Sequence, residues 1–180
     1  MKVVETALAG VLVLEIEPIE DERGFFARTW DRAELRSRGL TADLDQVSVA
    51  FNRVAGTLRG LHYQAAPHEE AKTVRCTAGA IFDVAVDLRE GSPTRHQWVG
   101  VELSATNHRS LYVPEGCAHG YLTLTDDAEV QYQISAPYRP DAARGYRWDD
   151  PTFAIGWPVD VRCISSRDAA LPFVVGDLVG

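Results

Sequence analysis

A histidine, a lysine and a tyrosine on strand-like segments are the residues of this chain best suited to chemistry. His62 lies in "TLRGLHYQ" (57–64), Lys72 in "HEEAKTVRC" and Tyr132 in "EVQYQIS" (129–135). A histidine can be a general base near neutral pH, because its reference pKa is about 6.5. A lysine can stabilise a developing oxyanion, and a tyrosine hydroxyl can deliver a proton. The three residue types indicate proton transfer, although each also occurs as an edge charge or a core side chain.

The five histidines do not form a metal motif. A metal-binding β-barrel usually carries two histidines two residues apart on one strand, and no His-x-His occurs here. His119 in "PEGCAHGY" follows a Pro-x-Gly turn and resembles the second motif of cupin barrels, whereas the first, metal-bearing motif is missing. We therefore expect no bound metal and interpret His119 as a hydrogen-bonded structural residue or a substrate contact. No Gly-rich dinucleotide fingerprint is present either.

Short segments with period-two alternation dominate the chain and predict β-strands. In "IFDVAVDL" (81–88) one face holds Phe82, Val84, Val86 and Leu88, and the two aspartates lie opposite. In "EVQYQIS" Tyr132 shares its face with Val130 and Ile134 and is expected to point into the barrel. Turn signals separate such segments at short intervals, which predicts an all-β fold with a few short helices: an antiparallel sandwich or barrel of the jelly-roll kind. One helix is expected after Asp31, its N-cap, and before Gly39. The tail from Pro137 onward alternates poorly and is expected to wrap the barrel.

Composition bounds the class of protein and its partners. The 180 residues are 46% apolar and 24% charged, which predicts one soluble domain over residues 1–180. The N-terminus lacks a signal-peptide pattern, and no apolar run approaches the roughly 20 residues that span a bilayer, so a cytoplasmic location is expected. Three unpaired cysteines fit a reducing compartment. A net charge of −8 argues against nucleic acid or an acidic membrane as a partner.

Seven segments, in order along nearly the whole chain, carry a family resemblance. They are "DERGFF" (21–26), "GTLRGLHYQ" (56–64), "AKTVRCTAGAIFDVAVDLREGSPT" (71–94), "LYVPEGCAHGY" (111–121), "EVQYQIS" (129–135), "ARGYRWDDP" (143–151) and "ISSRDAALP" (164–172). With these motifs the sequence resembles the dTDP-4-dehydrorhamnose 3,5-epimerase family, the RmlC-like branch of the cupin barrels.

The resemblance implies roles for four catalytic residues. His62 matches the family's base, and Asp168 matches the acid that pairs with it. Lys72 matches the lysine near the sugar's keto oxygen, and Tyr132 matches the acid that reprotonates the substrate from the opposite face. A 4-keto sugar has acidified hydrogens at C3 and C5, so proton transfer through an enolate inverts these centres without a metal, nicotinamide or flavin cofactor.

The resemblance also implies substrate contacts and an assembly. Arg23 and Arg59 match the diphosphate-binding arginines, and Tyr138 matches an aromatic residue that stacks on the nucleobase. The other expected substrate-binding residues are Phe26, Gln46, His119 and Arg167, the last of which stands where the family usually has a lysine. The implied partners are a nucleoside diphosphate keto-sugar and a second copy of the chain, in a homodimer whose first strands complete the other subunit's site.

Departures from the family pattern leave the substrate open. The stretch "QVSVAFN" stands before "RGLHYQ" where the family reads like Q-D-N-H-S, and an alignment without a gap places Val47, Ser48 and Val49 at the Q-D-N positions. Arg28 and Ala143 stand where acids are common. The alternatives to a dTDP-sugar 3,5-epimerase are therefore a single-centre epimerase on a dTDP- or CDP-linked sugar, a 3,4-ketoisomerase and a non-catalytic nucleotide-sugar-binding barrel.

Strict alternation places Arg59 and His62 on opposite faces of their strand, yet the resemblance requires both to reach the substrate. A glycine within a strand often marks a bulge that re-aims its neighbours. We therefore predict a break in the strand ladder at Gly60.

Overall fold

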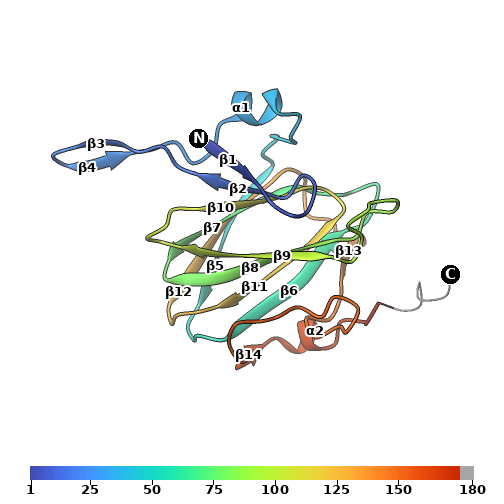
Figure 1. The fold of residues 1–180 in the computed structure, drawn as a ribbon. Helices are drawn as coiled ribbons and strands as arrows, with labels where there is room; N and C mark the ends of the chain where they lie inside the picture. The colour runs from blue at the N-terminus through green and yellow to red at the C-terminus, as the bar shows by residue number, and fades with distance from the viewer. Residues whose placement is uncertain (175–180) are drawn as a thin grey trace.

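Two antiparallel sheets packed face to face form the body of the protein (Figure 1). The structure is a computed structural model and describes residues 1–174. A separate two-stranded hairpin, β3 (Ile19–Asp21) and β4 (Gly24–Phe26), projects from one end of this body. The many strands and two short helices confirm the predicted all-β jelly-roll class.

The first sheet supplies Lys72 and Tyr132. In spatial order it consists of β1 (Lys2–Glu5), β2 (Leu12–Glu15), β10 (Ser110–Val113), β7 (Lys72–Ala78), β12 (Ala128–Ile134) and β5 (Gln46–Asn52). In the register of β7 with β12, Lys72 lies opposite Ile134, and Tyr132 opposite Val74. Lys72 and Tyr132 therefore lie near one another on neighbouring strands. The last strand in this order, β5, is an edge strand.

The second sheet supplies the histidines. Its spatial order is β13 (Ala143–Gly145), β6 (Thr57–Gln64), β11 (Cys117–Thr123), β8 (Ala80–Asp87) and β9 (Trp98–Ser104). A short β14 (Cys163–Ile164) pairs in parallel with β6. His62 on β6 lies directly opposite His119 on β11.

Apolar side chains between the two sheets form the main core. Val74 and Val130 from the first sheet pack with Ile81 and Leu103 from the second, all fully buried. Burying each such side chain contributes about 1.5–3 kcal/mol. The outer face of the second sheet packs under aromatic residues of the tail, such as Phe153. The tail therefore wraps the barrel, as predicted.

Two short helices flank the sheets. In α1 (Arg32–Ser37) the Asp31 carboxylate accepts hydrogen bonds from the backbone N–H groups of residues 33 and 34, and Gly39 follows at φ +74°, as predicted. The second helix, α2 (Ser166–Ala169), begins after the N-cap Ser165. Among residues 1–174, neither helix is long and apolar enough to cross a bilayer.

The pairing of β6 with β11 shifts register at Gly60, which confirms the predicted break. His62 pairs with His119, but Arg59 pairs with Tyr121, so two residues of β6 face a single residue of β11. This is the geometry of a β-bulge.

Glycine is required on both sides of the bulge. Gly60 adopts φ +132°, and a Cβ there would lie 2.5 Å from the Gly120 Cα atom. A Cβ on Gly120 would lie 2.9 Å from the Arg59 carbonyl oxygen. The close backbone approach turns the side chains of Arg59 and His62 toward the same cavity.

Candidate active site

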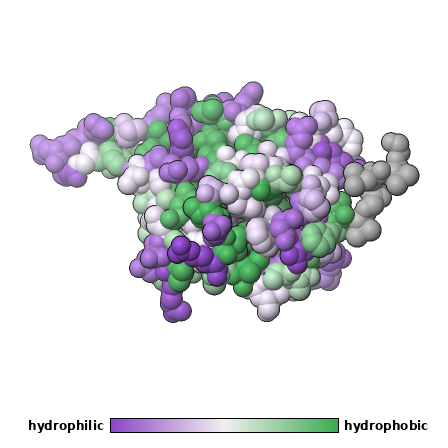
Figure 2. Space-filling view, turned by 60° about the horizontal axis from the view of Figure 1, so that its bottom comes forward, coloured by the Kyte–Doolittle hydropathy of each residue, from purple (hydrophilic) through white to green (hydrophobic). Residues whose placement is uncertain are grey.

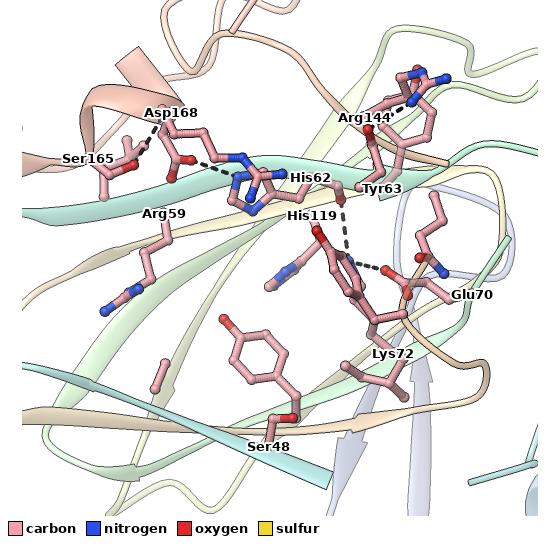
Figure 3. Close-up of a pocket in the computed structure, with 18 of the residues that line it drawn as sticks. Ser48, Arg59, His62, Tyr63, Glu70, Lys72, His119, Arg144, Ser165 and Asp168 are labelled. Carbon is pink, nitrogen blue, oxygen red and sulfur yellow. Dashed lines mark hydrogen bonds and ion pairs between the residues drawn. The ribbon is translucent and has the colours of Figure 1, made fainter. Parts of the chain in front are cut away.

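A cavity of about 640 Å³ opens between the two sheets (Figure 3). This volume is in the range of ordinary small-ligand sites, roughly 300–1,000 Å³. The nine predicted site residues that line it are Gln46, Arg59, His62, Lys72, His119, Tyr132, Tyr138, Arg167 and Asp168. Residues separated by up to 122 positions in the chain therefore meet at one site.

His62 is held by a buried carboxylate. Its Nε2 atom lies 2.9 Å from Oδ1 of Asp168, a residue of α2 that is only 5% exposed. The other carboxylate oxygen accepts the Gly60 N–H at 3.2 Å, and the Ser165 hydroxyl accepts the Asp168 N–H at 3.0 Å. The bulge glycine and the helix cap thus fix the orientation of the carboxylate.

The carboxylate of this pair is held in its ionised form. Burial alone would raise the pKa of Asp168, but hydrogen bonds from His62, Gly60 and Ser165 outweigh it and lower this pKa below its ordinary value. An ionised Asp168 holds the imidazole proton on Nε2. The Nδ1 atom is then the nitrogen with a free lone pair, which a general base needs.

Lys72 is fixed by a carboxylate that sequence reasoning missed. Its Nζ atom lies 2.8 Å from Oε1 of Glu70 and 3.4 Å from the His62 carbonyl oxygen. Both side chains of the ion pair are only 10% exposed (Figure 3). The position of Glu70, two residues before Lys72, was the available signal. The pair holds a cationic group at a defined place in the cavity.

Tyr132 projects from the first sheet, whereas His62 and Asp168 are held by the second sheet and its attached helix. The phenol shares its face with Val130 and Ile134, as the alternation predicted. Burial, more than the neighbouring Tyr121 and Asp83, raises the pKa of Tyr132 well above its ordinary value. The hydroxyl therefore keeps its proton at neutral pH and is available as a proton donor.

His119 belongs to a second buried dyad. Its Nε2 atom lies 2.7 Å from Oδ1 of Asp83, which is fully buried, and burial raises the pKa of this carboxyl. Alternation placed Asp83 opposite the apolar side chains of its strand, but that face is the barrel interior, and the apolar face packs under the tail. Within residues 1–174, no three His, Cys, Asp or Glu side chains are grouped to hold a metal ion.

Arginines give the cavity a cationic lining in a chain of net charge −8. Arg59 and Arg167 were predicted, and Arg144 on β13 was not. The two acids in the lining, Glu70 and Asp168, are each paired with a basic side chain. The excess positive charge suits an anionic group such as a diphosphate.

The register of β5 corrects the alignment made without a gap. Gln46 and Ser48 line the cavity, whereas Val47 and Val49 lie on the outer face, 55% and 60% exposed. Because successive strand residues point to opposite faces, the two valines do not occupy substrate-facing positions. Gln46, predicted as a substrate-binding residue, faces the cavity.

The structure does not bring Arg23 and Phe26 to the cavity of their own chain. Both belong to the projecting hairpin, where the Arg23 side chain is 84% exposed and pairs with Asp21, and Phe26 is 70% exposed. Arg28, which stands where an acid is common, pairs with Asp31 at 3.1 Å near α1. The intrachain site thus lacks the hairpin residues that the resemblance assigned to it.

Comparisons with known proteins place the chain in one family. The family model described as dTDP-4-dehydrorhamnose 3,5-epimerase matches residues 5–175. The dTDP-4-dehydrorhamnose 3,5-epimerase of Salmonella typhimurium is 43% identical over 178 residues, which is 97% of this chain and 96% of that protein.

Two solved structures show the same fold. The dTDP-4-dehydrorhamnose 3,5-epimerase of Bacillus anthracis, with TDP and PPi bound, has a TM-score of 0.92 at 42% identity, over 96% of this chain and 99% of that one. ChmJ, a 3'-monoepimerase from Streptomyces bikiniensis in complex with dTDP-quinovose, has a TM-score of 0.87 at 32% identity, over 94% of this chain and 86% of that one. With these matches over nearly its whole length, the chain belongs to the dTDP-4-dehydrorhamnose 3,5-epimerase family.

Proposed function

We propose that this protein is an epimerase that inverts C3 and C5 of dTDP-4-dehydro-6-deoxyglucose in deoxysugar biosynthesis. One observation carries the proposal: the base His62 and the acid Tyr132 enter one cavity from opposite sheets. Inversion requires that a proton leaves one face of a carbon and another arrives on the opposite face. A base and an acid on facing walls supply this arrangement.

The steps follow from the side chains present. His62 takes the proton from carbon through Nδ1, and the C–H electron pair moves into an enolate whose negative oxygen lies at C4. The Lys72 ammonium, held by Glu70, stabilises that oxygen. Tyr132 then donates its proton to the other face, and the C4 ketone re-forms. Each acid or base contribution is worth about 10²–10⁴ in rate.

The remaining cavity residues hold the substrate. Arg59 and Arg167, with Arg144, bind the diphosphate; Gln46 and His119 contact the sugar or nucleoside; and Tyr138, 51% exposed at the cavity, stacks on the base. The epimerase is a single domain over residues 1–180, of which residues 1–174 are described. Its three cysteines are free thiols, which fits a cytoplasmic location.

A homodimer completes this site. Arg23 and Phe26 lie on an arm that reaches away from its own barrel, so a second subunit is the surface on which they can serve as substrate contacts. Figure 2 shows the arm with a hydrophilic tip, and also hydrophobic side chains at the surface of the barrel. On the outer face of β5, Val47, Val49 and Phe51 are 55%, 60% and 51% exposed, a row that a second subunit would cover.

The dimer has a direct test. A Val49→Asp substitution places a charge in the apolar row without altering the inner face of β5, so sedimentation should show a monomer with the native thermal unfolding transition of the barrel. An Arg23→Ala variant should remain dimeric and raise the KM. A wild-type monomer in sedimentation would contradict the assembly.

The function is tested by following C3 and C5 of 4-keto-6-deoxyglucose by NMR in heavy water, linked first to dTDP and then to CDP. We expect deuterium entry and inversion at both carbons with the dTDP sugar. Exchange at one carbon only would identify a single-centre epimerase. Activity with the CDP-linked sugar alone would show that the substrate carries CDP and not dTDP. A ketone appearing at C3 would identify the isomerase. Exchange at neither carbon with either nucleotide would refute the epimerase.

A further inference from the structure

A row of polar groups that do not line the cavity lies near Tyr132. Tyr121 on β11 is fully buried, and its hydroxyl donates a hydrogen bond to Oδ1 of Asn52 at 3.2 Å. Tyr121 and Tyr132 pack in the same core cluster, each with its ring against His119, and Tyr121 is, after burial, among the causes that raise the pKa of Tyr132. Tyr121 therefore joins the surroundings of Tyr132 to Asn52, the last residue of β5.

The direction of these hydrogen bonds is determined by Asn52. Its Nδ2 donates to the Ala128 carbonyl at 3.0 Å, so its Oδ1 faces Tyr121 and also accepts from Nε of Arg59 at 2.8 Å. An amide oxygen only accepts, so Tyr121 must donate to it. In the resting site the Tyr121 proton therefore points to Asn52, and the Tyr121 oxygen has lone pairs free to accept a proton.

This row matters because Tyr132 must become a phenolate during the proposed reaction. When its O–H bond breaks, the enolate electron pair forms the new C–H bond, the C4 ketone returns, and the negative charge stays on the phenolic oxygen. Burial, and in the resting arrangement also Tyr121 and Asp83, raise the pKa of Tyr132, whereas the charge of Arg59 lowers it. A nearby hydrogen-bond donor is needed to offset the cost of that charge.

We propose that Tyr121 is a positioning residue that stabilises the Tyr132 phenolate by turning its hydroxyl proton from Asn52 to the phenolic oxygen. The proton moves with its own oxygen, so no further co-reactant is needed. Arg59 remains hydrogen-bonded to Asn52 and satisfies the amide oxygen that Tyr121 releases. This inference rests on the proposed function, because it assigns Tyr121 to the reprotonation step only.

The test compares inversion with solvent exchange in Tyr121→Phe. Exchange needs only His62 to remove and return a proton on one face, whereas inversion needs Tyr132. With dTDP-4-dehydro-6-deoxyglucose in heavy water, we expect inversion to slow about 10- to 100-fold, the usual effect of one hydrogen bond to a charged oxygen. Exchange at the same carbon should change less than about twofold. Unchanged inversion, or inversion and exchange falling together, would overturn the inference.

Two further variants separate this role from a structural one. Tyr112→Phe removes an equally buried hydroxyl, which accepts the Thr41 N–H at 3.0 Å on the outer side of the first sheet, and it should leave the ratio of inversion to exchange unchanged. Adding Tyr121→Phe to Tyr132→Phe should not slow the residual inversion further. An equal effect of Tyr121→Phe in both backgrounds would overturn the inference.

The outcome also distinguishes the inference from the function on which it rests. If the wild-type protein neither exchanges nor inverts this sugar, the proposed function and the inference about Tyr121 are both refuted. If the wild-type protein exchanges and inverts the sugar and Tyr121→Phe does so at the same rates, the role of Tyr121 is refuted and the proposed epimerase function stands.

Discussion

Replacing Gly60 with alanine tests how the bulge builds the site. The new Cβ would lie 2.5 Å from the Gly120 Cα and 3.1 Å from the His119 carbonyl oxygen, contacts with backbone that no side-chain movement relieves. The φ of +132° adds strain of about 1–3 kcal/mol for a residue with a side chain. Overpacking of this kind costs a further 1–3 kcal/mol or so. We expect the free energy of unfolding to fall by about 2–6 kcal/mol, a large part of a typical 5–15.

Gly60→Ala should also lower kcat of the protein that remains folded, beyond the activity lost through unfolding. Separating β6 from β11 would move His62 and withdraw the Gly60 N–H from Asp168, and a misplacement of about 1 Å can cost 10²-fold in rate. Urea unfolding and kcat on the folded fraction measure the two effects. Gly24→Ala is the control for stability, because Gly24 has a similar φ of +123° but nothing within 4 Å of its added Cβ. The reasoning fails if Gly60→Ala is no less stable than Gly24→Ala, or if it keeps the wild-type kcat.

Two other substitutions test charged pairs: one removes the partner of Lys72 in the cavity, and the other removes a buried carboxylate that stabilises the fold. Glu70→Gln removes the partner of Lys72 and should lower kcat about tenfold with little change in KM. The control Glu69→Gln, at an exposed neighbouring position, should leave kcat and KM unchanged. Equal steady-state kinetics for the two variants would contradict the role of Glu70. Hydrogen bonds from Arg89, with two hydroxyls, outweigh burial and lower the pKa of Asp87, so its stabilisation is present above the unfolded pKa of about 3.9 and is lost as pH falls below it. Asp87→Asn should therefore be less stable than the wild type by about 2–3 kcal/mol at pH 7. In thermal unfolding the difference in stability between the two proteins should become smaller toward pH 2. A difference that does not depend on pH would refute this.

The local parts of the fold were predictable because they depend on neighbouring residues. The alternation around Tyr132 identified its inward face, and the pair of Asp31 and Gly39 identified the ends of α1. The bulge followed from a conflict between alternation and the two roles assigned to "TLRGLHYQ". Each of these features is specified within a few positions of the chain.

The partners of the functional groups were harder to predict, since they come from distant strands. Asp168 lies 106 positions after His62, and only the family resemblance paired them. Alternation in β8 separated Asp83 from its apolar neighbours but did not show which face was interior, because both faces are covered. The contact of Tyr121 with Asn52 depends on how the edge strand β5 of the first sheet packs against β11 of the second. Such contacts follow from the packing of the two sheets.

The central claim is that His62 and Tyr132 act on opposite faces of the same carbon. The most direct measurement records deuterium exchange and inversion separately for His62→Asn and Tyr132→Phe, with dTDP-4-dehydro-6-deoxyglucose in heavy water. The account predicts that His62→Asn does neither, and that Tyr132→Phe still exchanges the C–H proton with retained configuration but inverts at most very slowly. Exchange by His62→Asn, or inversion at the wild-type rate by Tyr132→Phe, would contradict it.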